Sequence, residues 1–386
     1  MRIGFDAQVL TEGKTAESHY LSRLVEHLLL EDAALEVFLF SSDKVCVDYE
    51  PYIHSPRVTR VVERPGIGHR NAWPARVLPQ LLARHGIDVF HAPVRSFLPF
   101  FRSPCPSVLT IFELPFFRGR RTPQSLWKEL RGRTDQWLWS RSAAQIIALS
   151  DFVRAQAARE WRLPGERIAV TPVGCDNDLR TAMSPREEQQ ILAKYHLEGR
   201  RYVLAVSGLD HSRRNPDLLL EAFARVHRQL EQDVYFVFTG NTFRSEGHYD
   251  RLLRKMSMLG IREKVIAAGF VSDRVFQVIQ ANASASVVTP FYSGVPMAIL
   301  DSFVNGVPVV ASDRGAIPEY AAEGAVLVDP YDVEGIVRAV CLFLEDSPER
   351  DTYIEKGLLR SREFSWEKMA KDTLGIYAGL LSRSDR

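Results

Sequence analysis

The chain lacks the features that mark several large classes of protein. Its four cysteines, Cys46, Cys105, Cys175 and Cys341, are far apart and show no CxxC spacing, which excludes a disulfide framework and a cysteine-based metal site and favours a reducing compartment. No run of 18 apolar residues occurs, so no segment is predicted to span a membrane. The formal net charge is only +1 and no zinc-finger or RNA-binding signature is present, so no nucleic-acid partner is expected.

The first residues also lack the signature of a targeting segment. MRIGFDAQVL has one basic residue, no long apolar region and no cleavage site. It therefore predicts a buried first strand rather than a signal peptide. Together, these absences predict a cytoplasmic protein without a metal.

What the chain does contain is typical of two α/β domains. Hydrophobic residues make up 46% and charged residues 25%, as in ordinary globular proteins, and 386 residues exceed the length at which one core keeps growing. Short apolar runs alternate with helical stretches in two series, a pattern typical of parallel strands buried on both faces. The first series is MRIGFDA, EVFLFSS, VTRVVE, IDVFHAP, SVLTIFEL, QIIALSD and RIAVTPV, and the second is YVLAVSG, VYFVFTGN, VIAAGFVS, ASVVTPF, VPVVAS and AVLVDP.

The domain limits follow from a change of texture between the two series, where the polar helical stretch SPREEQQILAKYHLEG intervenes. We expect one Rossmann-like domain over residues 1–185 and a second over 186–365, each a doubly wound parallel sheet, facing each other across a cleft. Residues 366–386 predict an amphipathic helix, which we expect to pack back on the first domain.

In sheets of this kind, ligands bind beyond the carboxyl ends of the strands. The first candidate loop lies in VLAVSGLDHSRRNPDLLLEAF, where a strand ends at Gly208 and a helix begins after Asn215, its expected N-cap. Arg213 and Arg214 precede that helix, and a helix start with two guanidinium groups favours a phosphate. The alternative is that both arginines lie on a solvated loop.

The second candidate loop lies in TPFYSGVPMAILDSFVNGVPVV, where a strand turns at Gly294 into a short helix. Gly294 lets a bulky anion approach the backbone closely. If the helix extended back to Ser293, Asp301 would point to a broadly similar side, where its carboxylate can accept hydrogen bonds from a ribose diol. The alternative is an exposed, unpartnered Asp301. A third loop, within residues 311–330, can border the same site through a turn at Gly315.

The order of these motifs resembles a known family. The second half reads SGLDHSRRNPDLLLEAF, VFTGN, AAGFVSDRVFQVIQANAS, TPFYSGVPMAILDSFVNGVPVVASDRGAIPE and FSWEKMAKDTLGIY, and the first half MRIGFDAQVL, KTAESHYLSRLVEHL, IDVFHAP, SVLTIFELPFF and IIALSDFVRAQAARE. Together they resemble the retaining nucleotide-sugar glycosyltransferases of family four, which have the GT-B fold. The resemblance covers nearly the whole chain and implies that the second domain binds a nucleoside diphosphate sugar and the first binds the acceptor.

The resemblance also assigns roles to residues of the donor side. Arg213 and Arg214 would neutralise the diphosphate, and the helix start at Gly294 would lie beneath the phosphates. Ser293 and Asp301 stand where the family has paired glutamates, one addressing the sugar and one the ribose. The implied donor residues are Gly208, Arg213, Arg214, Asn241, Phe270, Val271, Ser293, Gly294, Val295 and Asp301, with Phe270 and Val271 at the base.

The sequence departs from the family pattern on the acceptor side as well. The glycine-rich turn after the first strand reads Ala16, Glu17 and Ser18, and the family's His-Asp pair reads Phe112 and Glu113. Glu113 or Glu17 is expected to orient the acceptor hydroxyl, with a purely structural polar role as the alternative for each. The implied acceptor residues are Glu17, Ser18, Phe112 and Glu113, and the implied catalytic residues are Arg213, Arg214, Ser293 and Glu113.

One basic and aromatic stretch bears on membrane contact. PFFRGRRTPQSLWKELRGRTDQWLWSR, residues 115–141, holds seven basic and two acidic residues with Phe and Trp interleaved. Cations near an anionic leaflet contribute about 1 kcal/mol each, and amphipathic aromatics suit the interface, so a peripheral contact with the inner face of the cell membrane is one interpretation. A solvated basic helix with inward-packed tryptophans and a basic groove for an anionic glycan are the others.

The sequence therefore predicts a retaining, metal-independent glycosyltransferase without a cofactor, acting from a UDP- or GDP-sugar on a hydroxyl of a glycan or lipid-linked acceptor. The alternative is a catalytically impaired relative that binds nucleotide or a partner without turnover. A nucleotide-sugar epimerase or a nicotinamide dehydrogenase is a third class, and the dehydrogenase is disfavoured because no strand is followed by GxGxxG. The sugar, the base, the acceptor and the oligomeric state stay open.

Overall fold

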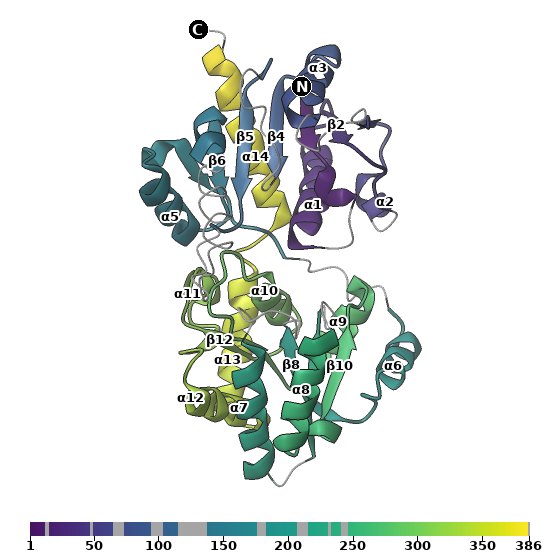
Figure 1. The fold of residues 1–386 in the computed structure, drawn as a ribbon, viewed down its shortest axis with the longest axis vertical. Helices are drawn as coiled ribbons and strands as arrows, with labels where there is room; N and C mark the ends of the chain where they lie inside the picture. The colour runs from purple at the N-terminus through teal and green to yellow at the C-terminus, as the bar shows by residue number, and fades with distance from the viewer. Residues whose placement is uncertain are drawn as a thin grey trace. The chain divides into compact units, whose positions relative to one another are not determined.

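The chain divides into two compact units, each built on one parallel sheet (Figure 1). The computed structural model describes residues 1–11, 15–46, 49–64, 73–93, 103–114, 137–175, 183–206, 215–230, 233–240 and 246–384. Unit 1 comprises Met1–Gly174 with Ser365–Arg386, and unit 2 comprises Cys175–Phe364. The sequence placed the limits at 185/186 and 365/366. The first predicted limit coincides with the start of the next helix, at Pro185. Local sequence pattern marks where regular structure resumes, whereas the division into units depends on which part of the chain each residue contacts.

The unit 1 sheet has the strand order β3-β2-β1-β4-β5-β6-β7, with every pair parallel. All seven apolar runs predicted in the first half form its strands. These are β1 (Arg2–Asp6), β2 (Glu36–Ser41), β3 (Val58–Val62), β4 (Val89–Pro93), β5 (Ser107–Ile111), β6 (Gln145–Ala148) and β7 (Ile168–Val170). The central strands β4 and β5 are buried throughout, whereas the edge strand β3 is largely exposed, as expected for a sheet that helices cover only over its middle.

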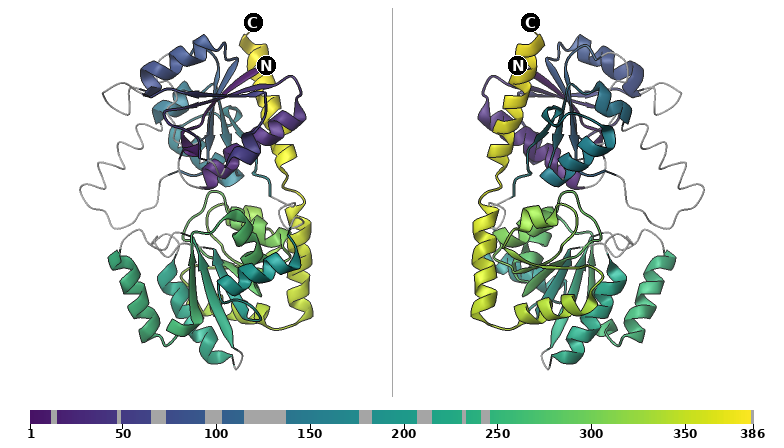
Figure 2. Two further views of the ribbon diagram at one scale, coloured as in Figure 1. Left: turned by 90° about the vertical axis from the view of Figure 1, so that its right-hand side faces the viewer. Right: turned by 90° about the vertical axis from the view of Figure 1, so that its left-hand side faces the viewer.

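Helices and short turns connect these strands. They are η1 (Gln8–Leu10), α1 (Ala16–Glu31), α2 (Glu50–Ile53), η3 (Trp73–Val77), α3 (Leu78–Arg84), α5 (Asp151–Trp161), η4 (Gly165–Arg167) and the C-terminal α14 (Trp366–Ser384). Helix α14 returns to unit 1 and packs along α1, as Figure 2 shows. His19 of α1 meets Trp366 of α14 edge to face, with ring centroids 5.6 Å apart. The predicted return of the last helix to the first domain is confirmed.

The unit 2 sheet has the strand order β10-β9-β8-β11-β12-β13, again all parallel. Its strands are the six apolar runs predicted in the second half: β8 (Arg201–Val206), β9 (Val234–Thr239), β10 (Val265–Gly269), β11 (Ala285–Val288), β12 (Val309–Ser312) and β13 (Ala325–Val328). From β8 the chain builds outward through β9 and β10, and then returns to β11 on the other side of β8. The strand order therefore reverses between β8 and β11, which is the switch point where ligands bind in open parallel sheets.

Two helical layers cover the unit 2 sheet. The elements are α6 (Pro185–Lys194), α7 (Pro216–Gln229), α8 (Glu246–Met258), η6 (Arg262–Lys264), α9 (Asp273–Ala281), α10 (Met297–Val304), α11 (Ile317–Ala321), α12 (Val333–Leu344) and α13 (Pro348–Ser361). Alternate side chains of each strand enter opposite cores: Val203 joins the core beneath α7, α8 and α12, whereas Leu204 joins a smaller core beneath α6 and α9. Within the described residues, no helix is both long and apolar enough to cross a bilayer.

Candidate functional site

The candidate donor site lies at the carboxyl edge of the unit 2 sheet, around the switch point between β8 and β11. The loops that follow β11, β12 and β13 are described at this edge, and so is the start of α7. Four implied donor residues, Gly208, Arg213, Arg214 and Asn241, lie outside the described residues. The geometry of the site below is that of the described residues around this switch point.

A single glycine allows the loop after β11 to pack closely against the loop after β12. Gly315 has φ +67°, and a Cβ at this position would lie 2.9 Å from the Ser293 nitrogen and closer still to the Ser293 oxygen. The Ala316 N–H donates to the Ser293 carbonyl at 2.8 Å. The second and third loops singled out in the sequence thus meet directly, with the backbone of Ser293 resting on Gly315.

Helix α10 offers an N-terminus without a side-chain cap. It begins at Met297 after Pro296, and its first turn contains no acidic residue, so its N–H groups and dipole favour an anion. Ser293 and the buried Gly294 precede the helix. The helix therefore does not extend back to Ser293, which was the condition under which Ser293 and Asp301 would share a helical face. Asp301 is half-buried in α10 and accepts from the Asn305 side chain through its backbone oxygen at 2.8 Å.

The start of α7 differs from the sequence expectation. Asn215 occupies the N-cap position, but it adopts a left-handed conformation with φ 59° and its side chain does not cap the helix. Instead, its Nδ2 donates to the Pro330 carbonyl at 2.6 Å, which ties α7 to the loop after β13. Its N-cap residue thus leaves the N–H groups of this helix start uncapped, as Pro296 does at α10.

Three buried polar atoms lie at this edge, and the sequence singled out neither Thr239 nor Thr289 and gave Asn215 only a capping role. The atoms are the hydroxyl of Thr239, the last residue of β9, the hydroxyl of Thr289, the residue after β11, and Oδ1 of Asn215 at the start of α7. Each residue is at most 3% exposed, and none of the three atoms has a hydrogen-bond partner among the described residues. Buried polar atoms are almost always satisfied, so this edge holds hydrogen-bonding capacity that the described residues leave unused. For the two threonines, the sequence signal is a polar residue directly at the end of an apolar run.

Phe270 and Val271 follow β10, at the outer side of the same edge. Phe270 is 62% exposed and Val271 is half-buried. Val295, half-buried, follows Gly294 in the loop before α10. The described donor-side residues therefore all lie on loops at the carboxyl edge or, for Asp301, on the helix that starts there.

Two family models match the chain, and together they span most of it. "Glycosyl transferases group 1" matches residues 187–360, and "Glycosyltransferase Family 4" matches residues 18–179. The chain belongs to the family-four glycosyltransferases.

Curated relatives of this glycosyltransferase include sugar transferases. The chain is 28% identical over 270 residues to "O-antigen chain mannosyltransferase B" of Escherichia coli, covering 70% of this chain and 68% of that protein. It is 25% identical over 248 residues to "MMP alpha-(1->4)-mannosyltransferase" of Mycolicibacterium hassiacum, covering 63% of this chain and 56% of that protein. The matched part thus spans between about half and two thirds of these relatives.

Solved structures share the fold over nearly the full length. Anabaena HepE in complex with UDP and glucose superposes with a TM-score of 0.77 at 18% identity, covering 98% of this chain and 100% of that one. WaaG, "a glycosyltransferase involved in lipopolysaccharide biosynthesis", gives a TM-score of 0.74 at 15% identity, with coverage of 98% and 100%. These likenesses confirm the predicted GT-B fold.

In unit 1, the implied acceptor residues of the glycosyltransferase differ in their accessibility. Ser18 is fully buried, and its hydroxyl forms the α1 capping box with Thr15 and bonds the Tyr49 hydroxyl at 2.6 Å, so the structure gives it a structural role. Phe112 is also buried, edge to face with Tyr20 at 5.1 Å.

Two acidic side chains remain for acceptor contact in unit 1. Glu17, in the first turn of α1, and Glu113, after β5, are both half-buried. Their contact with an acceptor stays a prediction. Within the described part of the chain, no three His, Cys, Asp or Glu side chains are grouped so that they would hold a metal ion.

Proposed function

We propose that this glycosyltransferase transfers a sugar from a UDP- or GDP-linked donor to a hydroxyl group of a glycan or lipid-linked acceptor. The observation that carries this proposal is a pair of helix starts, α7 and α10, that flank the switch point of the unit 2 sheet and whose N-cap residues make no capping hydrogen bond. Two helix starts at one place favour the two phosphates of a nucleoside diphosphate. The names of the mannosyltransferase relatives and of the HepE complex with UDP support a sugar nucleotide as the donor.

We infer that the reaction retains the sugar configuration and needs no metal. Negative charge develops on the leaving diphosphate, where helix N–H groups and the cations of Arg213 and Arg214 would stabilise it. On one face of the sugar, the bond from the anomeric carbon to the phosphate oxygen breaks, and the acceptor oxygen bonds to the same carbon. The acceptor proton passes to the departing phosphate oxygen, so this chemistry does not need the histidine that relatives carry.

We assign the remaining donor and acceptor roles from the positions of four residues in the two units. Asp301 would accept hydrogen bonds from the ribose diol, and the exposed Phe270 ring would pack against the base. Ser293, whose backbone rests on Gly315, would hydrogen-bond the transferred sugar. Glu113 would orient the acceptor hydroxyl from unit 1.

A second candidate function is binding without turnover. Ser293 is neutral where the family resemblance implies a carboxylate, and Asp301 is one methylene shorter than the implied glutamate. A panel of UDP- and GDP-sugars separates the two functions. Release of UDP or GDP with any donor supports the transferase, whereas saturable nucleotide binding without hydrolysis or transfer on any acceptor supports the non-catalytic relative.

Arg214→Ala is expected to weaken UDP or GDP binding by about 1.5 to 3 kcal/mol, because it removes a charge-assisted contact to the diphosphate. Calorimetric titration of the variant and the wild type measures this difference. Arg186→Ala, which removes an exposed arginine from the first turn of α6, is the matched control and is expected to leave the affinity unchanged. Equal affinity of the Arg214 variant and the wild type would count against the phosphate role.

We further propose that the enzyme acts in the cytoplasm in polysaccharide biosynthesis, with a peripheral contact to the inner face of the membrane through residues 115–141. Residues 115–136 of that stretch lie outside the described residues. In the described part, Trp137 and Leu138 are 46% and 38% exposed, and the Arg141 guanidinium lies 5.4 Å from the Trp137 ring centroid. An exposed aromatic beside a cation suits a headgroup interface. Flotation with anionic and neutral vesicles tests the contact, and equal recovery with both would contradict it.

A further inference from the structure

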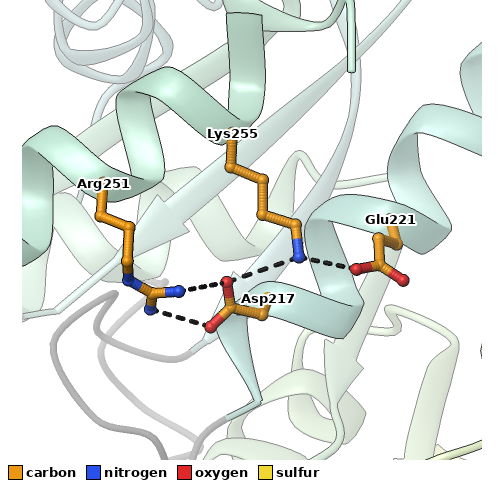
Figure 3. Close-up of polar contacts among 4 residues, drawn as sticks. All are labelled: Asp217, Glu221, Arg251 and Lys255. Carbon is orange, nitrogen blue, oxygen red and sulfur yellow. Dashed lines mark hydrogen bonds and ion pairs between the residues drawn. The ribbon is translucent and has the colours of Figure 1, made fainter. Parts of the chain in front are cut away.

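Four charged side chains form a ladder between α7 and α8 (Figure 3). Asp217 and Glu221 lie one turn apart on α7, and Arg251 and Lys255 lie one turn apart on α8. Arg251 Nη1 and Nη2 each donate to one Asp217 carboxylate oxygen at 2.9 Å. Lys255 Nζ reaches Asp217 at 3.4 Å and Glu221 at 2.6 Å. The two cations thus balance the two carboxylates, with Asp217 contacted by both.

Asp217 occupies a sensitive position in this ladder, because it is the acidic residue of the first turn of α7. The first turn of α10, on the other side of the switch point, contains no acid. Both of these turns lie in the described part of the chain. Asp217 is therefore the only carboxylate in the first turns of the two helices that flank the proposed diphosphate site.

An uncompensated carboxylate at this place would oppose anion binding. The start of a helix carries a partial positive charge, which a carboxylate in the first turn offsets, and a carboxylate also repels an arriving diphosphate. Burial alone would raise the pKa of the Asp217 carboxyl, but the hydrogen bond from Arg251 and the charges of Lys255 and Arg251 outweigh burial and lower it. Asp217 is thus ionised at neutral pH, and its charge is cancelled by its two partners on α8.

We propose that Arg251 and Lys255 are positioning residues of the donor site, which neutralise Asp217 so that the start of α7 stays attractive to a nucleoside diphosphate. The inference rests on the proposed function, since it assumes that the diphosphate binds at this helix start. A purely structural ladder would instead only tie α8 to α7. The two roles differ in how binding responds to removal of the Asp217 charge.

The test is a charge-rescue series measured by calorimetric titration with UDP and GDP. The double variant Arg251→Gln/Lys255→Gln leaves Asp217 in the first turn of α7, and Glu221 one turn further along, without their partners. Its dissociation constant is expected to rise about threefold to tenfold at low salt, mainly through Asp217 at the helix start. Added salt is expected to shrink this defect, because it screens the exposed charge. Adding Asp217→Asn to the double variant removes the repelling charge and is expected to restore the affinity to within about twofold of the wild type.

A cation at the opposite end of the same sheet provides the control. Lys264 pairs with Asp233, and the two residues directly precede β10 and β9. Lys264→Gln removes one positive charge there and likewise leaves a carboxylate without its partner, and it is expected to leave nucleotide affinity unchanged.

The outcomes separate this inference from the function on which it rests. Unchanged affinity in the double variant overturns the inference, and so does a triple variant that binds as weakly as the double variant, since lost packing and not charge would then explain the defect. A wild type that binds neither UDP nor GDP would overturn the proposed function itself.

Discussion

Gly315→Ala is expected to lower the free energy of unfolding of unit 2 by about 2 to 5 kcal/mol. The left-handed backbone at φ +67° costs a non-glycine residue roughly 1 to 2 kcal/mol, and forcing a side chain into filled space adds about 1 to 3 kcal/mol. The new methyl group would meet the Ser293 backbone, which is anchored to Ala316 and has no flexible end that can move aside. Urea unfolding followed by fluorescence measures the loss.

Gly260→Ala is the matched control for this prediction. Gly260 also has a positive φ, +73°, but a Cβ there would meet nothing within 4 Å, so only the conformational cost of about 1 to 2 kcal/mol is expected. The Gly315 variant is also expected to weaken UDP or GDP binding, because the loop before α10 must shift, whereas the Gly260 variant is expected to bind normally. Equal stability and equal binding of the two variants would contradict the role given to the contact between Gly315 and Ser293.

The second large effect concerns a buried histidine in unit 1. His91 on β4 bonds the Tyr377 hydroxyl of α14 through Nδ1 at 2.5 Å and the Thr110 hydroxyl of β5 through Nε2 at 2.7 Å. Thr110 in turn bonds the Tyr20 hydroxyl of α1 at 3.0 Å. All four side chains are fully buried. This chain of hydrogen bonds therefore joins the returning C-terminal helix to the sheet and to α1.

Acid is expected to destabilise unit 1 through His91. Burial lowers the pKa of His91 from 6.5 to about 3, so between these values the unfolded chain binds a proton that the folded chain does not. The stabilisation is fully present above pH 6.5 and is lost as the pH falls toward 3, at about 1.4 kcal/mol per pH unit and roughly 5 kcal/mol in all. Burial raises the pKa of both Tyr20 and Tyr377, so neither titrates in this window.

The comparison of His91→Gln with the wild type isolates this contribution. Glutamine keeps a polar side chain in place but does not titrate, so the slope of unfolding free energy against pH between 3.5 and 6.5 is expected to fall by up to about 1.4 kcal/mol per pH unit. His54→Gln, which removes an exposed histidine, is expected to leave the slope closer to that of the wild type. Identical slopes for His91→Gln and the wild type would show that His91 is not held neutral.

Local pattern in the sequence was enough to predict the strands and their grouping. Runs such as VYFVFT and RYVLAV are rich in residues that favour strands. Their nearly continuous apolar character indicates that both faces of each strand are buried. The carboxyl edge of the second sheet could also be expected to bind the ligand, because Ser293 and Gly294 lie in the loop that follows a strand.

Contacts between loops far apart in the sequence could not be predicted from local pattern. Asn215 was expected to cap its helix, but its side chain instead bonds the carbonyl of Pro330, and only the assembled sheet brings these loops together. Gly315 was expected to make a turn, yet its main effect is to admit the Ser293 backbone. Ser18 was placed on the acceptor side, whereas Tyr49 and the capping box with Thr15 bury its hydroxyl.

The central claim is that the carboxyl edge of the unit 2 sheet holds a nucleoside diphosphate, and an NMR titration of isotope-labelled protein with UDP and GDP tests it most directly. The account predicts saturable shifts of the backbone amide signals of Ser293, Gly294 and Asn215 with at least one nucleotide, while the amides of Asp233 and Lys264 at the amino end stay in place. No saturable shift at Ser293, Gly294 or Asn215 with either nucleotide, or shifts confined to unit 1, would contradict it.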